Sequence, residues 1–166
     1  MATFAQRMAG AAMLSVQTYE EVESDKSATG QALAVVLISS VAAGIGGLGA
    51  GPIGLIKMTI FAVVGWVLWA ALIYLIGARL LPEPETRAEI GELLRTTGFA
   101  SAPGIARILG FIPLIGVIIS FAAFVWMLVA MVIAVRQALD YRSTGRAALV
   151  CLIGWIVSMV VFWIWR

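Results

Sequence analysis

The sequence predicts an all-α integral membrane protein with about five transmembrane helices, and three observations support this fold class. Hydrophobic residues make up 62% of the 166 residues, and charged residues make up only 12%. Over residues 30–81 the only charged side chains are those of Lys57 and Arg79, and over residues 98–135 the only one is that of Arg107. A water-soluble domain covers most of its surface with polar and charged side chains, so such stretches exclude one.

Four segments are long and apolar enough to cross a hydrocarbon layer about 30 Å thick, which takes about 20 helical residues. They are residues 30–50, 58–81, 114–135 and 147–165. A further segment, residues 98–112, carries Arg107 and reaches only about 22 Å at about 1.5 Å per residue. It either crosses as a short tilted helix that ends in a turn at Pro113, or enters and returns as a re-entrant hairpin.

The basic residues favour five crossings over four. With five, one side holds Arg7, Lys26, Arg79, Arg87, Arg95, Arg136, Arg142 and Arg146, and the other side holds Lys57 and Arg166. With four crossings, the 136–146 loop moves to the other side of the membrane, and the two sides differ less in their number of basic residues. Because short basic loops stay in the cytoplasm, we expect a cytoplasmic amino terminus and a carboxyl terminus on the outer side.

Two amphipathic helices are expected outside the spans. The first carries an apolar stripe at helical spacing and would lie in the membrane interface, with a mobile tail as the alternative. Its stripe consists of Phe4, Met8, Ala11, Ala12, Ser15 and Tyr19. The second covers residues 86–97 on the cytoplasmic side and begins with Thr86 and Glu89 at capping-box spacing.

Four acidic residues lie between the first amphipathic helix and the first span. They are Glu20, Glu21, Glu23 and Asp25. A solvated charged surface is the simplest interpretation of this run. A docking site for a basic partner is the alternative.

Small residues near the end of the first span predict either close helix packing or a tight turn. Gly44, Gly46 and Gly49 match the dinucleotide fingerprint in spacing, but a hydrophobic helix precedes them and no acidic residue follows for over 30 positions, which rejects that function. Instead, Ala43, Gly47 and Gly51 would form a ridge for helix packing, or the glycines serve the turn before Pro52. Ala130, Ala134 and Ala138 predict a similar ridge.

Arg107 is the one charge that no span boundary explains, and an ionisable residue inside the membrane is a functional candidate. Its side chain would extend to the interface, pair with helix carbonyl groups, or contact a substrate or anion. Pro103 and Pro113 bracket this segment, either as a broken helix at a transport site or as an ordinary helix start and turn. Trp126, inside its span, is expected to pack against neighbouring helices.

Enzymatic chemistry is not indicated. Histidine is absent, Cys151 is the only cysteine, and no carboxylate lies in a span. We therefore expect no catalytic residues, no cofactor and no metal site. The net charge of +2 is too small to suggest nucleic acid as a partner.

Motifs spread over nearly the whole chain resemble the Yip domain family, as found in bacterial relatives of the Ypt/Rab-interacting membrane proteins. They are residues 19–23 (YEEVE), 29–33 (TGQAL), 98–104 (GFASAPG), Trp126, 136–140 (RQALD) and 143–148 (STGRAA). The resemblance implies one membrane domain over residues 1–166, with five spans and a cytoplasmic amino terminus. Eukaryotic relatives act with small GTPases through a longer amino-terminal region that this chain lacks, so no GTPase partner is expected.

The expected role is therefore that of a non-enzymatic membrane protein that organises or stabilises a membrane assembly by packing with its own copies or with other membrane subunits. The alternative is a small-solute or lipid transporter whose path uses the broken third segment around Arg107. Nine arginines against two lysines suit a bacterium, where the cytoplasmic membrane would be the location.

Overall fold

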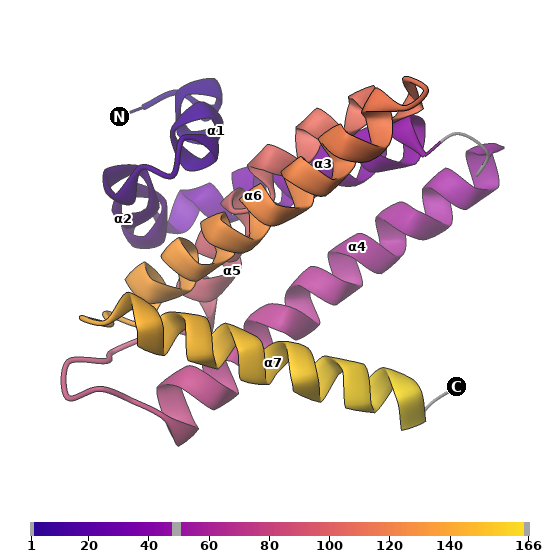
Figure 1. The fold of residues 1–166 in the computed structure, drawn as a ribbon. Coiled ribbons are helices and arrows are strands. Elements are labelled where there is room, and N and C mark those ends of the chain that lie inside the picture. Colours follow the sequence, from indigo (N-terminus) through magenta and orange to yellow (C-terminus); the bar gives the residue numbers. More distant parts are fainter. Residues whose placement is uncertain (1, 48–50, 165–166) are drawn as a thin grey trace.

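The computed structural model describes residues 2–47 and 51–164, and within them every regular element is a helix (Figure 1). The α-helices are α1 (Phe4–Ala12), α2 (Val16–Ser24), α3 (Thr29–Gly46), α4 (Gly51–Ile73), α5 (Ile90–Phe99), α6 (Ile115–Ala138) and α7 (Thr144–Ile164). Three further segments are the 3₁₀ helices η1 (Lys26–Ala28) and η3 (Ala102–Phe111) and the π-helix η2 (Tyr74–Leu80). The predicted all-α class is confirmed.

Four helices in the described residues are long and apolar enough to cross a membrane. They cover Lys26–Gly46, Gly51–Leu80, Ile115–Ala138 and Thr144–Val161. These correspond to the four long segments predicted from the sequence, two of which have ends, Ala50 and Trp165, outside the described residues. The second helix begins at Gly51 rather than at Met58, because Pro52 fits the first turn of a helix, where no backbone N–H is needed.

The predicted short segment, residues 98–112, is part of a longer rod. Helix α5 leads through one turn into η3, which packs between α3 and α6. With a rise of about 1.5 Å per residue in α5 and about 2 Å in η3, the lengths of the two helices add up to about 35 Å along the chain. The far end of the rod lies beside the end of α3, where Gly46 approaches the backbone of Arg107 and Gly110.

Helix α5 differs from the interfacial helix expected over residues 86–97. It begins at Ile90, because Glu89 and Glu92 form the capping box, whereas the Thr86 hydroxyl accepts a hydrogen bond from the Glu83 N–H at 3.0 Å. It is also largely enclosed by protein. Leu93, Thr96, Thr97 and Phe99 are fully buried.

Three segments meet at one end of the bundle. The Gln137 amide donates to Glu20 at 3.0 Å, which joins α6 to α2. The backbone N–H of Arg142 donates to Glu83 at 2.9 Å, which joins the α6–α7 turn to the 82–89 loop. If the third segment were re-entrant, Glu20 and Gln137 would lie on opposite sides of the membrane. Their contact therefore fits an odd total number of crossings. The count of five stays a prediction.

The amino-terminal region contains two helices instead of one. The Ser15 hydroxyl accepts from the Thr18 N–H and starts α2, and Leu14 has a φ of 62°, so the chain turns between α1 and α2. The predicted apolar stripe packs against the bundle. Ala11 and Tyr19 are fully buried, and the Tyr19 hydroxyl donates to the carbonyl oxygen of Ala11 at 3.1 Å.

The predicted ridge of Ala43, Gly47 and Gly51 is wrong, because these residues do not share a helix. Helix α3 ends at Gly46, Gly47 is its cap, and Gly51 starts α4 with a φ of 58°. The alternative, turn geometry, holds for Gly51, since a positive φ is accessible to glycine without strain. The second ridge is confirmed: Ala130, Ala134 and Ala138 are fully buried.

Candidate functional site

Arg107 lies just past the middle of η3, and its side chain points back into the bundle. Its Nε donates to the carbonyl oxygen of Gly104 at 3.1 Å, and its Nη2 donates to the Ser39 hydroxyl at 3.1 Å. Helical side chains lean toward the amino-terminal end of their helix, which explains the direction. The contact with the Gly104 carbonyl oxygen fits pairing with a helix carbonyl, one of the roles expected from the sequence. Extension to the interface and contact with a substrate or anion stay predictions.

Close backbone packing makes this arrangement possible. A Cβ added at Gly104 would overlap the Ser39 hydroxyl and come within 2.9 Å of the Arg107 guanidinium. A Cβ added at Gly46 would overlap the carbonyl oxygen of Arg107. Gly46, which belongs to the rejected dinucleotide pattern, and Gly104, which ends the 98–104 motif, thus create the room for the arginine.

The guanidinium lines a cavity of about 400 Å³ between α3, α4, the α5–η3 rod and α6. Most of the wall is apolar and includes Trp66, Trp69, Met127 and Met131. Both indole N–H groups already have acceptors: that of Trp66 donates to the carbonyl oxygen of Leu94 at 3.1 Å, and that of Trp69 donates to Met131 Sδ at 3.3 Å. The cavity therefore combines one cation with mainly hydrophobic walls.

The two prolines and Trp126 have separate positions. Pro103 lies buried in the first turn of η3, which fits an ordinary helix start, and Pro113 is exposed in the turn before α6. Trp126 is exposed on α6, and its indole N–H donates to the carbonyl oxygen of Ala12 at 2.8 Å. Its contact is thus with the end of α1.

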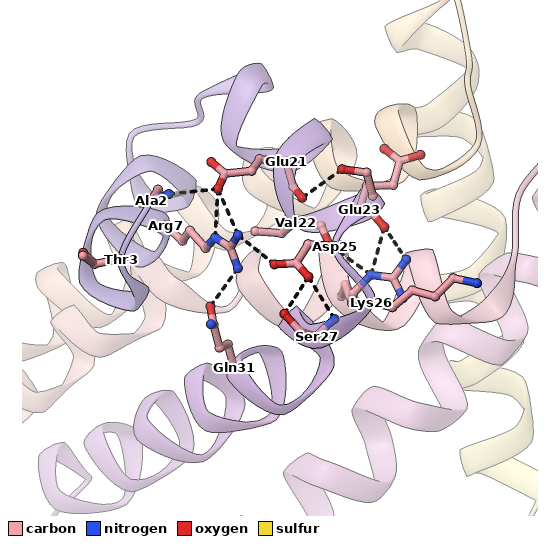
Figure 2. A network of polar contacts seen from close by, with 12 residues as sticks. Ala2, Thr3, Arg7, Glu21, Val22, Glu23, Asp25, Lys26, Ser27 and Gln31 are labelled. Carbon is pink, nitrogen blue, oxygen red and sulfur yellow. Dashed lines mark hydrogen bonds and ion pairs between the residues drawn. The ribbon is translucent and has the colours of Figure 1, made fainter.

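A polar cluster at the other end of the bundle contains the acidic run (Figure 2). Arg7 is only 3% exposed and donates to Glu21 at 2.9 Å, to Asp25 at 2.8 Å and to the Gln31 amide oxygen at 3.2 Å. Arg95 donates to the backbone carbonyl oxygens of Val22, at 3.0 Å, and of Glu23. These contacts tie α1, α2, α3 and α5 together.

The sequence alone does not single out Arg7 and Arg95 as structural centres. A count of basic residues treats Arg7 as a free cytoplasmic cation. The available signal was the nearby run of carboxylates, which needs a counter-charge. A basic partner for Glu21 or Asp25 would have to compete with Arg7, so docking at this run stays a prediction.

Glu20 and Glu23 line a second, polar cavity of about 510 Å³ at this end of the bundle. The other lining residues are Ser24, Arg136, Gln137, Asp140, Tyr141 and Arg142. Burial raises the pKa of Glu23 to about 7, the carboxylates of Asp140, Glu92 and Glu20 add to the rise, and Arg95 opposes it.

This shift predicts a pH dependence of stability. The folded chain keeps a proton on Glu23 that the unfolded chain releases above its ordinary pKa of 4.5, so this group's contribution to stability falls as the pH rises from about 4.5 to about 7. Glu23→Gln should raise the thermal unfolding midpoint at about pH 8 and flatten its dependence on pH. The exposed Glu85→Gln is the control, and equal pH profiles for wild type and Glu23→Gln would contradict the prediction.

Comparison with known proteins identifies the family. A sequence model described as the Yip1 domain matches residues 13–165, which is nearly the whole chain. The match includes Arg107, both prolines, Trp126 and the acidic run. No curated protein and no solved structure matches the chain. The sequence resemblance is confirmed, and the chain belongs to the Yip1 domain family of membrane proteins.

Proposed function

We propose that the chain is a non-enzymatic membrane protein that organises or stabilises a membrane assembly by packing against partner helices, first of all those of a second copy. The observation that carries this proposal is the position of α7. Its first half packs Ala147, Val150 and Gly154 inside the chain, and after Gly154 no described side chain is buried. In Figure 1 this second half extends away from α6. It is free to contact another helix.

A groove between α6 and α7 supports a protein partner. It has a volume of about 440 Å³ and is lined by Phe124, Trp155, Ser158 and Met159. The rings of Phe124 and Trp155 stack with centroids 5.8 Å apart and form an apolar wall of the groove. Ser158 is exposed in this groove, and small residues at a helix surface allow close helix approach in membranes, where lipid tails give little hydrophobic drive.

The test is the size of the protein after extraction in a mild detergent, measured by light scattering during gel filtration. Wild type should run as an oligomer or with a stoichiometric partner. Ser158→Leu fills the groove and should shift the protein to the monomer, whereas Val160→Leu, also on α7 but outside the groove, should not. A wild type that is strictly monomeric and carries no partner would count against the proposal.

We further propose five crossings of a bacterial cytoplasmic membrane, with the amino terminus inside and the carboxyl terminus outside. The asymmetry of basic residues supports this threading. So do the contacts that join α2, the 82–89 loop and the α6–α7 turn at one end. Ser143→Cys in a Cys151→Ser background should resist a membrane-impermeant thiol reagent added to intact cells, and Arg166→Cys should react. The reverse pattern would invert the orientation.

A further inference from the structure

We infer that the cavity around Arg107 binds the phosphate group of an anionic phospholipid. This site goes beyond the packing role proposed above and does not depend on it. The first reason is the unbalanced charge of Arg107. No acidic residue occurs over residues 26–82 or 93–139, and no carboxylate in the described residues pairs with Arg107. An uncompensated charge in an apolar medium is unfavourable, so an anion that enters the cavity is stabilised there.

The second reason is the direction of the free donors. A guanidinium has five N–H groups. Those of Arg107 that reach protein acceptors are on Nε and Nη2, and within the described residues Nη1 forms no hydrogen bond. Because no buried side-chain nitrogen or oxygen lacks a partner in the described residues, Nη1 is at least partly accessible, and Arg107 is one of the residues that line the cavity. Its donors match the geometry with which arginine binds phosphate oxygens.

The third reason is that the cavity around Arg107 has both polar and apolar walls. The Ser39 hydroxyl lies 3.1 Å from Nη2 of the cation and Ser101 adds a second hydroxyl group to the wall, while Trp66, Trp69 and Met131 are largely apolar. A small, strongly hydrated anion gains no binding free energy from contact with the apolar wall. An amphiphile with an anionic headgroup and hydrocarbon attached gains from both. This favours a lipid over free phosphate.

The fourth reason is access from the bilayer. Met58 and Gly65 of α4 line the cavity and are exposed, so its rim reaches the exposed apolar surface of α4. Ser39, which holds the guanidinium, precedes the end of α3 at Gly46 by about 10 Å. A headgroup from the leaflet on that side reaches Arg107 without crossing the bilayer centre, which lies about 15 Å deep.

The experiment is native mass spectrometry of the full chain from micelles that contain one of three probes. Phosphatidylglycerol supplies the phosphate and the acyl chains, diacylglycerol with the same chains lacks the phosphate, and inorganic phosphate lacks the chains. Wild type should retain one phosphatidylglycerol per chain, about tenfold more than diacylglycerol. Arg107→Gln should lose this preference. Lys57→Gln, which removes an exposed cation on α4, should keep it.

Three results would overturn the inference. They are equal retention of phosphatidylglycerol and diacylglycerol by wild type, equal retention of phosphatidylglycerol by wild type and Arg107→Gln, and full displacement of the lipid by inorganic phosphate. Arg107→Lys keeps the charge without the planar fork, so it should fold and show a weaker preference if Arg107→Gln does not fold. The same spectra report the oligomer. A monomeric Ser158→Leu that still retains phosphatidylglycerol separates this site from the packing role.

Discussion

Replacing Gly46 with alanine is expected to destabilise the folded chain by about 1–3 kcal/mol, the usual effect of overpacking a filled interface. The added Cβ would overlap the carbonyl oxygen of Arg107, lie 3.0 Å from its carbonyl carbon and lie 3.2 Å from the backbone nitrogen of Gly110. All three are backbone atoms of the η3 segment, so no change of side-chain rotamer relieves the overlap. Since η3 is packed against α6 on its other side, the rod cannot simply move away from α3.

The measurement is unfolding by SDS titration in mixed micelles, with Gly30→Ala as a matched control on the same helix. A Cβ at Gly30 meets no atom within 4 Å. Alanine there should leave stability unchanged or raise it by about 0.5–1 kcal/mol, because alanine loses less backbone entropy in a helix. Equal losses in the two variants would show that glycine content, and not the contact with Arg107, controls stability.

Composition predicts the long spans well because lipid as solvent demands uninterrupted apolar helices. Composition does not predict the bounds of the third segment, because its length depends on the helices that pack around it. Arg95, Thr96 and Thr97 look interfacial in a linear sequence, yet all three are buried. Arg95 is tolerated there because it donates to the carbonyl oxygens at the end of α2, which lies 72 or 73 positions away. No local pattern encodes that pairing.

The candidate site is likewise predictable from the sequence only in part. The sequence singles out Arg107 because isolated intramembrane charge is rare. It does not reveal Ser39, which precedes Arg107 by 68 positions and becomes its partner only when α3 packs on η3. The glycine ridge failed for a related reason: whether Gly46 or Gly47 faces a neighbour depends on where α3 ends, and element boundaries are the least predictable feature of a helix.

Arg7→Gln is expected to release α1 from α2 and to lower stability by about 2 kcal/mol, between the effects known for surface and for fully buried ion pairs. Arg7 is 3% exposed, while its partner Glu21 is 35% exposed and keeps some solvation when the arginine is lost. Glutamine retains a polar, helix-compatible side chain, so the loss of stability reports the removal of the positive charge of Arg7. Proteolysis of the amino-terminal helices should accelerate, and SDS titration should measure the change in stability.

Arg142→Gln is the matched control, because Arg142 pairs with Glu85 at 2.6 Å but is 78% exposed, and its removal should cost less than about 1 kcal/mol. The effect of Arg7→Gln should also depend on pH. Hydrogen bonds from Arg7 lower the pKa of Glu21, and those from Ser27 and Arg7 lower that of Asp25. The stability from these carboxylates is therefore present above their ordinary pKa values and lost as the pH falls through the lowered ones. Wild type and Arg7→Gln should converge in acid, and a constant difference between them would mean that Arg7 acts through packing alone.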